Sequence, residues 1–132
     1  MSQENVEIVR RGYEAFNRSD IEGVIEIADP QVHWDMSERA FNPAVYEGHD
    51  GIRRFVEEMN EVWEDFRLEP LEFIDAGDKV VVSHLIRGRG RGSGVDVELP
   101  STSIYTLRNG KVIDNRMYRE HSDALEAAGL RE

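Results

Sequence analysis

The sequence contains no cysteine, which excludes disulfide bridges and thiolate metal sites. Basic residues are scarce beside acidic ones, at 16 against 27, so the net charge is -11. A chain with this charge repels nucleic-acid phosphates and anionic membrane surfaces. We therefore expect no nucleic-acid partner, and we interpret the local basic patch of Arg87, Arg89 and Arg91 as a solvated hairpin.

Long apolar runs and cofactor motifs are also missing. No stretch resembles a membrane-spanning helix of about 20 apolar residues, and the polar, acidic residues 1–5 predict no signal peptide. The four histidines show no His-x-His or Glu-x-x-His spacing, and no Gly-x-Gly-x-x-Gly sequence leads from a strand into a helix. We expect a cytoplasmic protein with no membrane contact, no metal and no cofactor.

The composition does favour a globular fold. With 132 residues and 39% hydrophobic content, the chain has enough apolar material for one core, so we expect a single domain over residues 1–132. Residues 79–86, 95–107 and 112–119 are predicted strands joined by the glycine-rich segment 88–94 and by Asn109-Gly110, a pair typical of tight hairpin turns. These segments predict an antiparallel meander.

A further strand is predicted immediately before the meander, over residues 67–76. Pro70 lies inside it, and proline restricts a strand to an edge of the sheet or to a bulge. Residues 31–36 predict a short separate strand, and residues 37–48 predict a loop.

Apolar residues recur every three or four positions elsewhere, which predicts helices. The expected helices cover residues 3–18, about 21–28, about 50–66 and about 123–128. Ser2, then Ser19 or Asp20, then Asp50 and Ser122 are the predicted N-caps, and Gly129 is the predicted end of the last helix. Asp29-Pro30 is expected to end the second helix.

This order of elements resembles the SnoaL-like branch of the nuclear transport factor 2 (NTF2-like) superfamily. The stretches that carry the resemblance are YEAFNRSD at 13–20, YEGHDGI at 46–52, LRNGKV at 107–112 and ALEAAGL at 124–130. The resemblance implies an α+β cone: a curved, mostly antiparallel sheet whose concave face is covered by three helices, with a small-molecule pocket between them. Polyketide cyclases, ketosteroid isomerases, limonene epoxide hydrolase and dehydratases share this fold, so the fold does not select an activity.

Asp35 is the first candidate catalytic residue. Residues 28–35 match without gaps the ketosteroid isomerase stretch that ends in the general base, so the resemblance implies this role for Asp35. A carboxylate between apolar walls has a raised pKa, which suits proton abstraction beside a carbonyl group near neutral pH. The alternative is structural, because Asp35 is equally able to cap the following loop or to pair with an arginine such as Arg119.

The hydrogen-bond donors of the isomerases are matched only in part. The position of their protonated acid falls on Ser103, a weaker oxyanion donor, and the position of their tyrosine falls near Gly12, next to Tyr13. We therefore do not expect a ketosteroid isomerase proper. His84, on the more apolar face of its strand, is either a general acid or base or a hydrogen-bonded core residue.

Strand alternation predicts the remaining lining of the pocket. If the last strand keeps its register, Ile113, Asn115, Met117 and Arg119 face inward, whereas a one-residue bulge turns Arg116 and Tyr118 inward instead. Several buried polar groups in one place favour a ligand or bound water, because unpaired they cost free energy. The predicted catalytic residues are Asp35, Ser103, His84 and Arg119. The predicted ligand-binding residues are Tyr13, Phe16, Trp34, Phe55, Met59, Trp63, Ser101, Tyr105, Asn115 and Met117.

Two functions of different classes remain open. One is a cofactor-free isomerase, cyclase or lyase that transfers protons on a small apolar carbonyl compound with Asp35 as base. The other is a non-catalytic domain of the same fold that binds a small ligand. The resemblance also implies a homodimer through the outer face of the sheet, with Arg116 and Tyr118 as the expected contacts.

Overall fold

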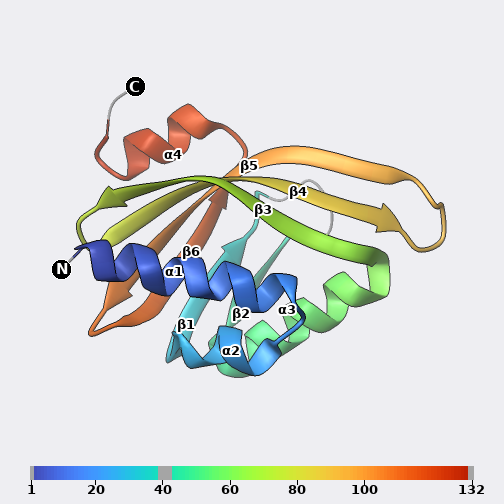
Figure 1. Cartoon of the computed structure of the whole chain (residues 1–132), viewed down its shortest axis with the longest axis horizontal. Coiled ribbons are helices and arrows are strands. Elements are labelled where there is room, and N and C mark those ends of the chain that lie inside the picture. The colour runs from blue at the N-terminus through green and yellow to red at the C-terminus, as the bar shows by residue number, and fades with distance from the viewer. Residues whose placement is uncertain (1, 39–42, 131–132) are drawn as a thin grey trace.

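The computed structural model describes residues 2–38 and 43–130 and confirms the predicted α+β architecture (Figure 1). Within these ranges six strands form one sheet in the order β2-β1-β6-β5-β4-β3, and only the β1–β6 pair is parallel. In chain order the elements are α1 (Ser2–Asn17), α2 (Ile21–Glu26), β1 (Ala28–Met36), β2 (Ala44–Glu47), α3 (Gly48–Val62), β3 (Trp63–Ala76), β4 (Lys79–Gly90), β5 (Asp96–Arg108), β6 (Lys111–Tyr118) and α4 (His121–Ala127).

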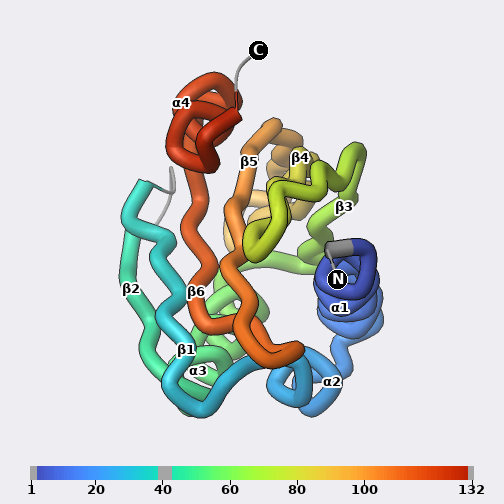
Figure 2. Tube along the Cα trace, turned by 90° about the vertical axis from the view of Figure 1, so that its left-hand side faces the viewer, coloured from blue at the N-terminus to red at the C-terminus, as the bar shows by residue number. Residues whose placement is uncertain are grey.

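The curved sheet separates two layers of helices (Figures 1 and 2). Helices α1, α2 and α3 lie on its concave side, where the main hydrophobic core is enclosed between helices and sheet. Helix α4 lies on the opposite side and packs Ala124 and Leu125 against Val81 and Ile104 of the outer face. The concave face is therefore the one that three helices cover, as the resemblance implied.

Strands β3 to β6 form the predicted antiparallel meander. Its last turn places Asn109 at φ 54° and Gly110 at φ 76°, as the Asn-Gly pair predicts. Pro70 lies in the edge strand β3, and the pairing register shifts between Pro70 and Glu72. Both predicted ways of tolerating this proline, an edge position and a bulge, are thus realised.

Replacing Gly110 with alanine should destabilise the fold by about 1 kcal/mol, because only glycine adopts its left-handed conformation without strain. No atom of the described residues lies within 4 Å of the added methyl group, so the effect isolates backbone strain. Gly92→Ala is the matched control, since Gly92 also has open space but no positive φ. Urea unfolding of both variants measures the difference, and an equal loss in both would contradict the explanation.

The first helices largely follow the predictions. Asp20 is the N-cap of α2, and its carboxylate accepts a hydrogen bond from the Gly23 amide. At the end of α1, the Asn17 side chain accepts from the Leu68 amide at 2.9 Å and donates to the Leu68 carbonyl at 2.8 Å. Because β3 is an edge strand, this amide satisfies backbone groups that no further strand pairs. It also fixes α1 over the sheet.

Several predicted boundaries are wrong. Helix α2 ends at Glu26, before Asp29-Pro30, and residues 44–47 of the predicted loop form β2. Helix α3 ends at Val62, since Trp63 already has extended dihedral angles and pairs with Gly90 of β4. The spacing of Trp63 and Phe66 fits a helical stripe, but strand pairing prevails over it.

Two predicted caps are also wrong. Glu47 and Glu120, not Asp50 and Ser122, occupy the N-cap positions of α3 and α4, and neither glutamate makes a side-chain capping bond within the described residues. Gly129 does end the last helix, with φ 79°. The predicted cap of α1 lies outside the described side chains.

A bulge in β6 settles which side chains face the core. Leu107 of β5 pairs with Val112, whereas Thr106 pairs with Asp114, so Ile113 is an extra residue. Val112 therefore takes the core position predicted for Ile113. After the bulge the predicted register holds, and Asn115 and Met117 face the concave side.

Candidate functional site

A cavity of about 50 Å³ lies between the concave face and helices α1, α2 and α3. It is large enough for a few water molecules. None of the described residues that line it is Asp, Glu, Lys or Arg. The lining residues are Val9, Gly12, Tyr13, Phe16, Val24, Ile27, Trp34, Met36, Phe55, Met59, Phe66, Leu68, His84, Ile86, Ser103, Tyr105, Asn115 and Met117.

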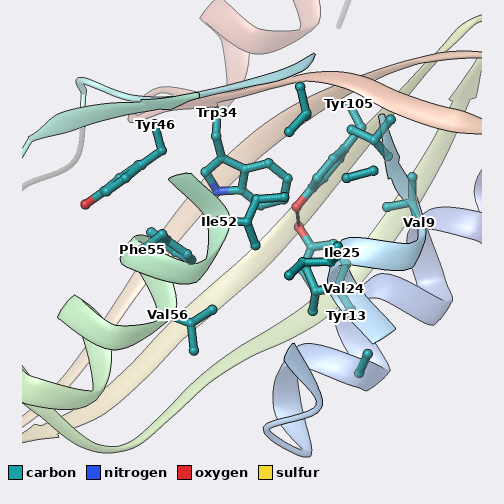
Figure 3. Packing of buried hydrophobic residues seen from close by; sticks show 14 of the residues in the cluster. Val9, Tyr13, Val24, Ile25, Trp34, Tyr46, Ile52, Phe55, Val56 and Tyr105 are labelled. Atoms are coloured by element: carbon teal, nitrogen blue, oxygen red, sulfur yellow. Dashed lines mark hydrogen bonds between the residues drawn. The ribbon is translucent and has the colours of Figure 1, made fainter. Parts of the chain in front are cut away.

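Hydrogen-bonded hydroxyl groups cross this cavity from the sheet to α1 (Figure 3). The Tyr105 hydroxyl donates to the Tyr13 hydroxyl at 2.8 Å, and Tyr13 lies 2.8 Å from Nδ1 of His84. Ser103, two residues before Tyr105 on β5, adds a further hydroxyl group to this side of the cavity. Three strand residues and one helix residue thus form a single polar cluster in an otherwise apolar wall.

Burial keeps the members of this cluster uncharged. Desolvation raises the pKa of Tyr105 to about 12 and raises the pKa of Tyr13 well above its ordinary value. Desolvation also lowers the pKa of His84 to about 4, so the imidazole is neutral at pH 7. In one neutral tautomer Nδ1 accepts from Tyr13 and Nε2 carries the hydrogen; in the other these roles are reversed.

Four buried polar atoms have no hydrogen-bond partner within the described part of the chain. They are Trp34 Nε1, His84 Nε2, Ser101 Oγ and Asn115 Oδ1. An unpaired buried donor or acceptor costs about 1–3 kcal/mol. Three of these residues line the cavity, the exception being Ser101. Such unpaired groups are typical of a site that water or a ligand completes.

The strand pairing explains why polar groups gather here. Trp34 of β1 is the register partner of Asn115 of β6, which is in turn the partner of Tyr105 of β5. The three side chains therefore form one row across the concave face. Ser103 and Met117 form the next pair along β5 and β6.

The prediction that Asp35 faces the cavity is wrong. Strand β1 alternates, with Val32 and Trp34 buried in the core, so Asp35 faces the outer side of the sheet. Its carboxylate accepts a hydrogen bond from the Ser37 amide at 2.9 Å and lies 4.0 Å from Nε of Arg116. Partial burial opposes ionisation, but the Ser37 bonds and the Arg116 charge together lower the Asp35 pKa below its ordinary value. The structural alternative, a loop cap paired with an arginine, is the one observed.

Three other predicted site residues do not line the cavity. Arg119 is exposed, and its Nε donates to the Glu38 carbonyl at 2.7 Å. Its predicted inward position is wrong because Met117 is the last residue of β6 that faces the cavity. Ser101 and Trp63 are buried, yet neither borders the cavity. Trp63 packs instead on Phe66 and Gly88, at the start of β3.

The other predicted residues all line the cavity, and their roles in binding or catalysis remain predictions. They are Ser103, His84, Tyr13, Phe16, Trp34, Phe55, Met59, Tyr105, Asn115 and Met117. Apolar lining residues that we did not predict share their periodicity: Val9 lies one helical turn before Tyr13, Met36 is two residues after Trp34, and Ile86 is two residues after His84. The helical and strand periodicities of the sequence therefore indicated these lining residues as well.

Two further classes of site are absent from the described part of the chain. No group of three or more His, Asp or Glu residues there is placed to hold a metal ion. None of the described helices is long and apolar enough to cross a membrane.

Comparison with known proteins agrees with this architecture. A Burkholderia pseudomallei NTF2-like protein of unknown function is 26% identical, with TM-score 0.78 over 93% of this chain and 95% of that one. TerC, co-crystallized with polyporic acid, is 28% identical, with TM-score 0.79 over 96% and 98%. A Catenulispora acidiphila protein with a ketosteroid isomerase-like fold, in complex with trimethylamine, is 17% identical, with TM-score 0.78 over 94% and 93%, and shows the fold alone.

The curated proteins yield no match to the sequence. The family assignment comes from the sequence itself, because residues 9–115 match the SnoaL-like domain. That stretch includes most of the cavity wall, from Val9 on α1 to Asn115 on β6. The chain therefore belongs to the SnoaL-like domain family and has the NTF2-like fold.

Proposed function

We propose that this protein binds a small, uncharged, mostly apolar molecule in the cavity on the concave face. The observation that supports the proposal most directly is the set of unpaired polar atoms on Trp34, His84 and Asn115, within a wall that has no charged side chain among the described residues. A ligand with one or two oxygen atoms would pair them, while its hydrocarbon part displaces water from the aromatic and methionine side chains. Because no charged side chain lines the described cavity, an ionised ligand would be buried without a counter-ion.

The size of the cavity limits this ligand. At about 50 Å³ it is smaller than the 300–1,000 Å³ typical of drug-sized sites. Met36, Met59 and Met117 all lie in the wall, and methionine adapts its shape easily. We therefore expect ligands of about one ring, accommodated by rearrangement of these side chains.

Leu68→Trp should prevent binding, because Leu68 lines the cavity and a larger ring there would fill it. Leu71→Trp is the matched control on the same strand, since Leu71 is 59% exposed and does not border the cavity. The measurement is thermal unfolding with cyclohexanol, cyclohexanone or methylcyclohexane. A ligand at 100 times its Kd stabilises the folded state by about 2.7 kcal/mol. A rise in Tm that survives Leu68→Trp would place the binding elsewhere.

A second candidate is proton-transfer catalysis, and the hydrogen bond between His84 and Tyr13 favours it. Since Asp35 lies on the outer face, His84 is the only titratable base among the described lining residues. In the tautomer whose Nδ1 donates to Tyr13, Nε2 has a free lone pair. It would take a proton from the carbon beside a carbonyl group, the C–H electron pair would move toward the carbonyl oxygen, and the proton would return to the rearranged product.

Deuterium exchange of the α-hydrogens of cyclohexanone in D₂O distinguishes binding from catalysis. A catalyst accelerates this exchange above the buffer rate, and His84→Gln removes the acceleration while the ketone still binds. Binding without faster exchange would eliminate the catalytic candidate and leave the binding function intact. Asp35→Asn should change neither result, because Asp35 is outside the cavity.

We also propose the homodimer that the resemblance implied. Helix α4 covers the part of the outer face around Val81 and Ile104, and Tyr118 packs against that cluster. Arg116 remains half exposed next to β1, close to Asp35 and Glu38. Gel filtration tests the proposal, since elution solely as the 15.2 kDa chain would refute it.

A further inference from the structure

Two of the unpaired atoms have complementary chemistry and belong to residues that are neighbours in the sheet. Trp34 Nε1 carries a hydrogen and only donates, whereas Asn115 Oδ1 only accepts. The two residues are register partners on the parallel strands β1 and β6, so their side chains leave the sheet side by side on its concave face. Both border the cavity, and they are 8% and 1% exposed.

The surroundings of this pair are apolar. The Trp34 ring lies 6.2 Å from the rings of Phe55 and Tyr105, and Figure 3 shows Trp34 and Tyr105 extending together from the sheet toward the helices. The Tyr105 hydroxyl is already engaged with Tyr13. The Tyr105 hydroxyl is therefore not a partner of either unpaired atom.

One kind of ligand group pairs both atoms at once. A hydroxyl oxygen accepts a hydrogen bond from the Trp34 N–H and donates its own hydrogen to Asn115 Oδ1. A ketone or ether oxygen accepts from Trp34 but leaves Asn115 unpaired, and a hydrocarbon leaves both unpaired. An ionised carboxylate has no hydrogen for Asn115, and no cationic side chain among the described lining residues compensates its charge.

We infer that the molecule bound in this cavity is a neutral alcohol, phenol or enol whose hydroxyl group is held between Trp34 and Asn115. This inference rests on the proposed binding function and specifies the chemical class of the ligand. Sites that hydrogen-bond a ligand hydroxyl reject analogues that lack it far more strongly than apolar pockets reject a missing methylene group. Trp34 and Asn115 are thus the residues that determine specificity.

Three probes of nearly equal size test the inference: cyclohexanol, cyclohexanone and methylcyclohexane. Cyclohexanol should bind at least ~10-fold more tightly than methylcyclohexane, with cyclohexanone between them, because each missing hydrogen bond leaves a buried group unpaired. The indole N–H resonance of Trp34, assigned by its loss in Trp34→Phe, should move downfield in the ¹H–¹⁵N spectrum with cyclohexanol and stay in place with methylcyclohexane.

Asn115→Leu should remove the preference for cyclohexanol, since leucine of similar size offers no acceptor. Asp35→Asn, on the outer face, should keep it. The wild-type spectra test the inference even if Asn115→Leu does not fold. Equal affinity for all three probes, or tight cyclohexanol binding without movement of the Trp34 resonance, would overturn the inference and leave the binding function standing. Failure of every probe to bind would refute the proposed function itself.

Discussion

Lowering the pH from 7 to 4 should remove about 3 kcal/mol of folding stability through His84 alone. Burial lowers the pKa of His84 in the folded protein to about 4, while the unfolded chain has the ordinary value of 6.5. Between these two values the unfolded chain binds a proton that the folded chain does not. Stability is therefore retained above about pH 6.5 and falls as the pH drops toward 4.

The groups that face His84 do not weaken this expectation. Tyr13 packs on it from α1 and Ser101 is its partner on β5, and neither changes charge in this range. Urea unfolding of the wild type and of His84→Gln from pH 7 to pH 4 measures the contribution of His84 to the loss of stability, because both proteins contain the same carboxylates. The variant should lose about 3 kcal/mol less on acidification than the wild type.

His33→Gln is the matched control. The His33 side chain is 42% exposed on the outer side of the sheet, so this variant removes a histidine without changing the core, and its result should differ from that of His84→Gln. Titration of the His84 ring by NMR provides a measurement without mutation. A midpoint near 6.5 in the folded protein would contradict the explanation.

The sheet was predictable because its signals are local. The Asn109-Gly110 turn, Pro70 at the edge and alternating apolar residues each act over a few positions, and tertiary packing agrees with all of them. Trp63 and Phe66 show where this approach fails. Their spacing of three residues fits a helix, and only the pairing of Trp63 with Gly90, which depends on the whole hairpin, makes the segment a strand.

The site was predictable as a set of side chains but not as a mechanism. Alternation along β5 and β6 placed Ser103, Tyr105 and Asn115 on the concave face. The match around Asp35 suggested a buried base, yet the alternation of β1 turns this side chain outward, because Trp34 occupies the core. A match in sequence order therefore did not preserve the side-chain direction on which the catalytic prediction depended.

The contact between Tyr13 and Tyr105 had no signal in the sequence. The two residues are 92 positions apart, and they meet because α1 lies across the sheet. Both were predicted as ligand-binding residues from their separate elements. Their mutual hydrogen bond, and the one from Tyr13 to His84, depends on how the helix is placed over the strands.

That contact leads to the last prediction: Tyr13→Phe should cost about 3 kcal/mol of stability, and Tyr105→Phe only about 1 kcal/mol. Removing the Tyr13 hydroxyl deprives two buried groups of a partner, His84 Nδ1 and the Tyr105 hydroxyl. Removing the Tyr105 hydroxyl leaves Tyr13 bonded to His84. Phenylalanine preserves the ring contacts of both residues, so packing changes little.

Urea unfolding at pH 7 measures both variants and the double variant. Because the two hydroxyl groups share one hydrogen bond, the double variant should cost less than the sum of the single ones. Equal costs for the two single variants, or strict additivity in the double variant, would contradict a central role for Tyr13. Tyr13 then has two roles: its hydroxyl group links α1 to Tyr105 of the sheet, and it orients the His84 ring in the cavity.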